Sequence, residues 1–180
     1  MAFSRVAALL LAGAASPNTL AHFEAQLASQ DSATVVLQQW CALRHISDPA
    51  VIHASDKSSA SLNHPPAALR RKLGIGKHDR IVMRHVHLSC GKVMLSEAWN
   101  WYVPSRLTAE MNTALAETDI PFGRVAAPLH FSRQPLKTLA GRAKNCPRST
   151  ISTHSALLRL PDGKPLALVL ECYTAANLEP

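Results

Sequence analysis

Residues 80–90 read Arg-Ile-Val-Met-Arg-His-Val-His-Leu-Ser-Cys, and this stretch decides the fold. Its apolar residues recur at every second position, as in a strand with one buried face. Arg84 falls on that apolar face, whereas His85 and His87 fall on the opposite one. A buried guanidinium is costly unless an anion meets it. The stretch therefore predicts a strand in which Arg84 faces an internal carboxylate or an anionic ligand; the alternative is an arginine that reaches past its neighbours to water.

The chain has 180 residues, 47% of them hydrophobic, which is enough for one globular domain with its own core. The net charge of +7 is scattered, and Arg70-Arg71-Lys72 is the only cluster of basic residues. No helix-turn-helix, zinc-finger or RNA-binding motif accompanies this cluster. The charge therefore favours attraction of a small anion over binding of nucleic acid, and we expect a monomer.

The first 21 residues have the features of a secretory signal peptide. An apolar run, Val6–Ala15, follows one basic residue, and small residues at Ala14 and Ala21 offer cleavage sites. As a helix this run would rise only about 15 Å, too short to span a bilayer. We therefore expect a leader, followed by one folded domain at residues 22–180, in a periplasmic or secreted protein. The alternative is an ordinary first helix packed on the core of a cytoplasmic protein.

Four cysteines would be oxidised in an exported protein, and three full pairings of them are possible. They are Cys41, Cys90, Cys146 and Cys172. None belongs to a CxxC pattern, so they do not indicate a metal site. His85 and His87 share a strand face, but two ligands without a third at a legible spacing do not define a metal site either. We expect no metal and no cofactor.

Periodicity and turn residues assign most of the remaining chain. They predict helices at 22–29, 32–44, 67–73 and 109–118, and strands at 80–90, 93–103, 154–160 and 165–174. Residues 47–66 are rich in Ser, Pro, Asp and Ala without periodicity, which predicts a flexible loop. Prolines interrupt residues 125–152, and no element is assigned there.

Two further features suggest a functional site. Glu171 lies in a strand that is apolar on both faces, so its carboxylate either pairs with a cation or serves in proton transfer. The simpler alternative is a core salt bridge between Glu171 and Arg84. Phe122 and Gly123 lie in a tight turn, where glycine lets the backbone approach a ligand and leaves its amides free to donate. On local evidence alone, an ordinary left-handed turn is the favoured explanation of these two residues.

The order of these features resembles the chorismate pyruvate-lyase family over residues 78–175. In chain order they are the strand with Arg84, a hairpin, a strand ending at Val103-Pro104, a Leu107-Thr-x-Glu-Met helix, Pro121-Phe-Gly-Arg124, and a Leu-Pro-Asp-Gly-Lys-Pro-Leu hairpin into Glu171. The resemblance implies an α+β fold, in which an antiparallel sheet of about six strands packs with helices around a small enclosed ligand pocket. It implies a carbon–oxygen lyase that eliminates pyruvate from chorismate to give 4-hydroxybenzoate, a step of ubiquinone biosynthesis, without metal or cofactor. The same fold serves as the effector-binding domain of GntR-type transcription regulators.

The resemblance also implies roles by position. Arg84 matches the family arginine that holds the ring carboxylate, and Glu171 matches the acid beside the developing ring hydroxyl. Phe122 and Gly123 match the turn that closes over the product, with Phe in place of Leu. The chain departs from the family at 99–101, where Trp-Asn-Trp replaces a Gly-Arg-Thr whose arginine serves the enolpyruvyl carboxylate. The spacing into Glu171 is also one residue longer than in the family.

The leading prediction is therefore a chorismate lyase-like enzyme. Arg84 and Glu171 are its expected catalytic residues, and Phe122 and Gly123 join them in binding a small aromatic carboxylate. The alternative is a non-catalytic binding module for a small aromatic or other anionic ligand, which an exported chain would favour. The missing second arginine also favours this alternative.

Overall fold

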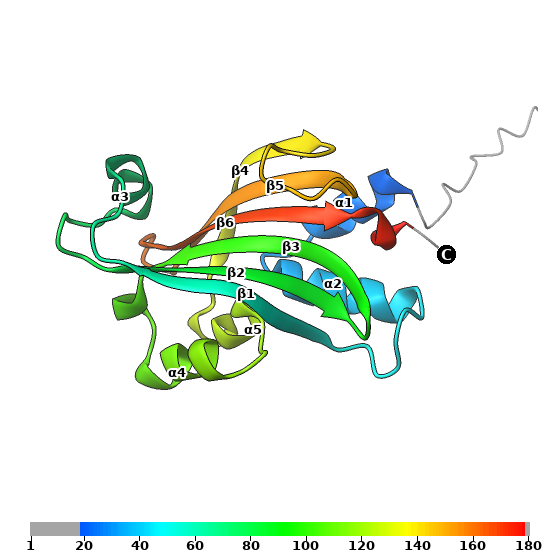
Figure 1. Ribbon diagram of the computed structural model, residues 1–180, viewed down its shortest axis with the longest axis horizontal. Helices are drawn as coiled ribbons and strands as arrows, with labels where there is room; N and C mark the ends of the chain where they lie inside the picture. The colour runs from blue at the N-terminus through cyan, green and yellow to red at the C-terminus, as the bar shows by residue number, and fades with distance from the viewer. Residues whose placement is uncertain (1–18, 179–180) are drawn as a thin grey trace, which may run out of the picture.

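The computed structural model describes residues 19–178, except for the side chains of residues 56 and 57, and shows an α+β domain (Figure 1). Its six strands form one antiparallel sheet in the order β1-β2-β3-β6-β5-β4. The strands are β1 (Ile52–Leu62), β2 (Ile81–Cys90), β3 (Val93–Tyr102), β4 (Ser132–Ala140), β5 (Thr150–Arg159) and β6 (Pro165–Thr174). The helices are α1 (Leu20–Ala28), α2 (Ala33–Leu43), α3 (Ala67–Leu73), α4 (Ala109–Glu117) and α5 (Phe122–Val125). The expected fold class, an antiparallel sheet with helices packed on it, is confirmed.

The sheet consists of two three-stranded meanders, β1–β2–β3 and β4–β5–β6, joined where β3 pairs with β6. Tight turns connect β2 to β3 and β5 to β6. Gly91 and Gly163 lie in these turns with φ of 54° and 81°, a backbone conformation that residues with a side chain rarely adopt. The two hairpins that the sequence predicts are therefore present.

The helices cover the two faces of the sheet unequally (Figure 1). We call the side covered by α1, α2, α4 and α5 the inner face; it carries Arg84 and Glu171. The opposite, outer face carries His85, His87 and Trp99, and α3 packs over one end of it. The alternation predicted for residues 80–90 is thus confirmed, with Arg84 on the buried side.

Aromatic side chains fill the inner core. Phe23 of α1 packs against Trp40 of α2 and Tyr173 of β6, with ring centroids 5.1 and 5.3 Å apart. Phe122 of α5 packs against Tyr102 of β3 at 5.4 Å. Burying each of these rings contributes about 1.5–3 kcal/mol, so they fix the helices on the inner face.

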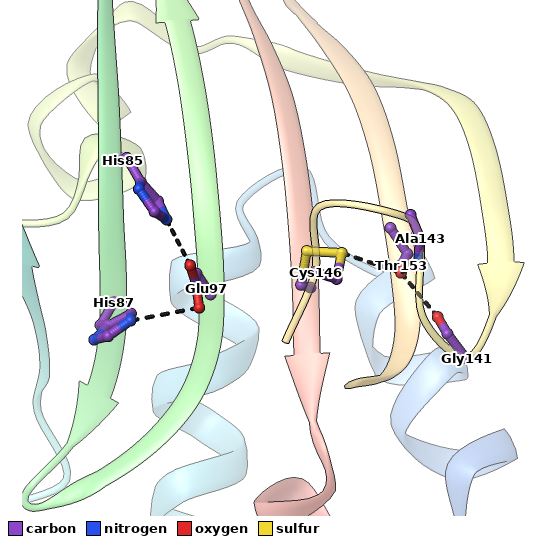
Figure 2. The surroundings of a disulfide bond; sticks show 8 residues. His85, His87, Glu97, Gly141, Ala143, Cys146 and Thr153 are labelled. Atoms are coloured by element: carbon purple, nitrogen blue, oxygen red, sulfur yellow. Dashed lines mark hydrogen bonds and ion pairs between the residues drawn. A yellow bond between two sulfur atoms is a disulfide. The ribbon is translucent and has the colours of Figure 1, made fainter. Parts of the chain in front are cut away.

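Two disulfides cross-link the fold. Cys41 of α2 is bonded to Cys90 of β2, and Cys146 is bonded to Cys172 of β6. The second bond holds the segment between β4 and β5 against the outer face (Figure 2). These are one of the three pairings that the sequence left open.

One sequence-based expectation about elements was wrong, and one strand lies where no element was assigned. Residues 47–66, predicted as a flexible loop, contain β1. The sequence gives no strand signal there, because only Ile52 and Ala54 near the start of β1 are buried core residues and the rest of the strand shows no apolar alternation. Pro135 interrupts the pattern of β4, yet it lies at a register irregularity of an edge strand, where proline is tolerated.

The expected leader at residues 1–21 lies mostly outside the described residues. Those of its residues that are described begin α1: Leu20 is the first helical residue, and Thr19 accepts a hydrogen bond from the His22 amide as its N-cap. Within residues 19–178, no helix has the length and apolar character needed to cross a membrane.

Candidate ligand site on the inner face

A small cavity lies between the inner face and the start of α2. Strands β2, β3, β5 and β6 form its floor, and the first turn of α2, α5 and Phe131 cover it. It is lined by Asp31, Ser32, Ala33, Thr34, Leu88, Ala98, Asn100, Phe122, Gly123, Phe131, Arg133, Leu158, Val169 and Glu171. Its volume of about 30 Å³ has room for roughly two water molecules or one small acidic group.

A buried ion pair lies in the wall of this cavity. The Arg133 guanidinium donates from Nη1 to Glu171 Oε1 at 3.2 Å and from Nη2 to Oε2. The hydroxyl of Tyr173 also donates to Oε2, at 3.0 Å. The Arg133 and Glu171 side chains are only 10% and 8% exposed, so either charge would be strongly destabilising without the other. A bidentate contact of this kind is the strongest that a guanidinium makes with a carboxylate.

The Glu171 carboxylate shifts the pKa values of both Arg133 and Tyr173. Burial alone would lower the pKa of Arg133, but the adjacent Glu171 carboxylate outweighs burial and raises that pKa above its ordinary value. Burial and the same carboxylate both raise the pKa of Tyr173 well above its ordinary value. Arg133 therefore stays charged and Tyr173 stays neutral at any physiological pH.

The start of α2 presents unused donors to the cavity. Ser32 is its N-cap, but its side chain does not cap the helix, and its hydroxyl is buried without a hydrogen-bond partner among the described residues. The first amides of a helix lack partners within the helix, and the helix dipole makes this end positive. Anions bind at helix ends of this kind.

Gly123 allows α5 to pack tightly against the start of α2. A Cβ atom at this position would lie 2.6 Å from Ser32 Oγ and 2.9 Å from Thr34 Oγ1, closer than such atoms approach one another. Glycine is therefore required here by space, not by a left-handed backbone. The short helix α5 replaces the left-handed turn that local sequence suggested.

A larger cleft of about 240 Å³ lies beside the cavity, between α1 and the strands β4 and β5. Asp31 and Arg133 line both spaces. Glu24 and His154 also line the cleft, and His154 Nε2 lies 2.9 Å from Glu24 Oε2. Ser152, below them on β5, donates to the other oxygen of Glu24.

The structure brings three of the four predicted site residues together. Phe122, Gly123 and Glu171 all line the cavity. Arg84 lies on the same inner face and is 1% exposed, so its guanidinium does not reach water, but it is not among the lining residues. Its neighbour across the β2–β3 pairing, Asn100, is one of them. The cation paired with Glu171 is Arg133, so the alternative of an Arg84–Glu171 salt bridge is wrong.

Sequence reasoning missed Arg133 and the start of α2. Arg133 lies in the proline-interrupted stretch that received no assignment. The Glu171 carboxylate in an apolar strand did indicate that a cation should lie nearby. Because proline within sheets occurs mainly in edge strands, Pro135 could have indicated an edge strand at the position of Arg133. The unused donors of α2 depend on tertiary packing and leave no sequence signal.

The two outer-face histidines share one carboxylate. His85 Nε2 lies 2.6 Å from Glu97 Oε1, and His87 Nε2 lies 3.5 Å from Glu97 Oε2 (Figure 2). His85 also stacks on Trp99, with ring centroids 4.1 Å apart. Among the described residues, no group of three or more potential ligand side chains is arranged to hold a metal ion. This cluster lies on the opposite face of the sheet from the inner cavity.

Comparison with known proteins gives one sequence relative and a set of shared folds. No family model matches the chain. It is 36% identical, over 168 aligned positions covering 83% of this chain and 71% of the relative, to the uncharacterized protein y4mC of Sinorhizobium fredii (strain NBRC 101917 / NGR234).

The fold is shared with domains of GntR-family regulators. The effector domain of PhnF from Mycobacterium smegmatis superposes with a TM-score of 0.57 at 11% identity, covering 81% of this chain and 89% of that one. The ligand-binding domain of a putative GntR-family regulator from Bordetella bronchiseptica gives 0.51 at 14% identity, covering 69% and 83%. A GntR-family regulator from Enterococcus faecalis V583 gives 0.52 at 12% identity, covering 71% and 96%. At these identities the likeness shows the fold.

Proposed function

The chain belongs to the same family as y4mC of Sinorhizobium fredii, and we propose that its domain binds a small anionic ligand without transforming it. The acidic group of the ligand lies in the cavity between Ser32, Gly123 and Arg133. The solved domains with the same fold are described as ligand-binding and effector domains, which supports a binding role.

One observation carries this proposal: the buried hydroxyl of Ser32 has no partner among the described residues and lies at the positive end of α2, in the wall of a cavity. Leaving a buried donor unsatisfied costs about 1–3 kcal/mol. An anion in the cavity would accept from this hydroxyl and from the first amides of α2, and so remove that cost. Arg133 adds the N–H groups that its contact with Glu171 leaves unused.

The other predicted residues take different parts in this proposal. Phe122 and Gly123 cover the anion, and Glu171 holds Arg133 in place instead of acting on the ligand. Arg84 lies one strand beyond the lining residue Asn100, and it attracts the anion by its charge without touching it. Because the cavity holds little more than an acidic group, the body of the ligand extends into the neighbouring cleft.

Calorimetry with simple anions tests the proposal. Inorganic phosphate, benzoate and 4-hydroxybenzoate are titrated into wild type, Gly123→Ala and Ser32→Ala, with Ser105→Ala on the surface as the matched control. The added Cβ of Gly123→Ala intrudes on the Ser32 and Thr34 hydroxyls, so binding of whichever anion the wild type takes should weaken about tenfold or more. The control should bind like the wild type. If none of the three anions binds, or if both cavity variants bind like the wild type, the proposal is wrong.

Chorismate lyase activity is the second candidate, favoured by the meeting of Phe122, Gly123 and Glu171 in one cavity. Two features count against it. Glu171 is already engaged by Arg133 and Tyr173, and the cavity is too small for a substituted ring unless α5 moves. Incubation of the purified protein with chorismate, followed by measurement of 4-hydroxybenzoate, decides between the two. Product formation that Glu171→Gln reduces by about 10²–10⁴-fold would establish the lyase.

A further inference from the structure

The cavity and the larger cleft are neighbours that share two lining residues. Asp31 and Arg133 line both, so a single ligand whose acidic group lies against Ser32 would extend past these two residues into the cleft. The cleft holds about 240 Å³, enough for a short chain of non-hydrogen atoms with a polar end.

The two parts differ in charge. The cleft is lined by the carboxylates of Glu24 and Asp31, and Glu24 is 28% exposed at its side chain. Arg133 does not offset them, because its charge is already matched by Glu171. His154, the remaining ionisable group of the cleft wall, lies 2.9 Å from Glu24. Ser152 also donates to Glu24, and the Arg133 amide donates to Asp31. Each carboxylate can accept about four hydrogen bonds, so the cleft still has acceptors for a cation.

From this division of charge we infer that the ligand is a zwitterion, with its acidic group at the start of α2 and a protonated amino group between Glu24 and Asp31. The inference rests on the proposed function, since the acidic end of the ligand fixes where its other end lies. A simple carboxylate would bring no positive charge to a cleft that holds Glu24 and Asp31, and an amine alone would leave the Ser32 hydroxyl unsatisfied. Charges of opposite sign at two ends of one site select for molecules that carry both.

Calorimetry with matched ligand pairs tests the inference. 4-Aminobutyrate and 6-aminohexanoate are compared with butyrate and hexanoate, which lack the amino group, and with butylamine and hexylamine, which lack the acid. The proteins are wild type, Glu24→Gln, Ser32→Ala and, as the matched control, Glu117→Gln at an exposed position of α4. Melting temperatures confirm that each variant is folded.

The wild type should bind at least one amino acid about tenfold or more tightly than the acid of the same length. Glu24→Gln should abolish this preference while leaving the affinity for the acid unchanged, and Ser32→Ala should weaken binding of both. The control should behave like the wild type. If the acids bind as tightly as the amino acids and still depend on Ser32, the zwitterion is ruled out and the anion site stands. If no compound binds, both the inference and the proposed function fail.

Discussion

At the scale of single residues, the pairing of Arg133 with Glu171 is the interaction on which the inner face depends most. Replacing only Arg133, as in Arg133→Met, leaves a buried carboxylate without its cation and should cost about 3–5 kcal/mol of unfolding free energy. The double variant Arg133→Met/Glu171→Leu removes both charges and should recover much of that loss. Urea unfolding measures both, with the exposed Arg142→Met as the control. A double variant that is less stable than the single one by a further several kcal/mol would contradict this account.

Tyr173 makes stability depend on pH in the alkaline range. Burial and the neighbouring Glu171 raise its pKa in the folded state well above the unfolded value of about 10. A raised folded-state pKa contributes stability that is complete below the unfolded pKa and is lost as the pH rises toward the folded one. The unfolding free energy of the wild type should therefore fall as the pH rises above about 10. Tyr173→Phe should show a smaller fall over the same range, and parallel curves for the two proteins would refute the prediction.

The residues of the site were predictable from the sequence to different degrees. Glu171 stood out as a charge in an apolar strand, and Gly123 stood out because glycine beside a phenylalanine suggests a close approach. Both line the cavity. Arg84 stood out for the same reason as Glu171 and is indeed buried, but a strand pattern gives only the face on which a residue lies and not whether its side chain lines a cavity there. Ser32 was indistinguishable from an ordinary helix N-cap in the sequence. Only the packed fold shows that its buried hydroxyl has no hydrogen-bond partner among the described residues.

At the scale of elements, central strands were predicted and edge strands were missed. β2, β3 and β6 carry apolar residues on the face or faces that they bury, so their patterns are strong. β1 and β4 lie at the two edges, where few side chains reach the core and polar residues are tolerated. The strand that supplies Arg133 was therefore the hardest one to find.

The disulfides fasten elements to the sheet, and each should contribute measurably to stability. The closed loops span 49 residues for Cys41–Cys90 and 26 for Cys146–Cys172. Loop-closure entropy predicts about 4 and 3.5 kcal/mol for them. Urea unfolding of Cys41→Ser/Cys90→Ser and Cys146→Ser/Cys172→Ser should show both losses, the first being the larger.

The second disulfide has an additional effect that the first lacks. It holds a segment whose Ala143 amide donates to Thr153 Oγ1, which in turn donates to the Gly141 carbonyl (Figure 2). Hydrogen exchange at Ala143 should therefore accelerate in the Cys146→Ser/Cys172→Ser variant and stay slow in the other. Equal midpoints for wild type and both variants would show that the bonds do not form in solution.

At the scale of the whole molecule, the limit of the folded domain can be set by deletion. Removing residues 1–21 takes away the Thr19 cap and Leu20, which packs against the core, whereas removing residues 1–18 spares both. Loss of a helix cap costs about 0.5–2 kcal/mol, so the longer deletion should lower the melting temperature by about 1–8 °C. The shorter deletion should melt like the full chain, and a drop of several degrees for it would place part of residues 1–18 in the folded domain.

The two meanders meet only along β3 and β6, and neither disulfide crosses that junction. Asp31 and Ser32 come from the first half of the chain, and Arg133 and Glu171 come from the second. A chain cut between β3 and β4 would therefore leave two fragments, each containing one disulfide, and their reassembly would complete the cavity. A ligand that touches both fragments would favour their reassembly, which makes this domain a natural starting point for a split sensor that reports its own ligand.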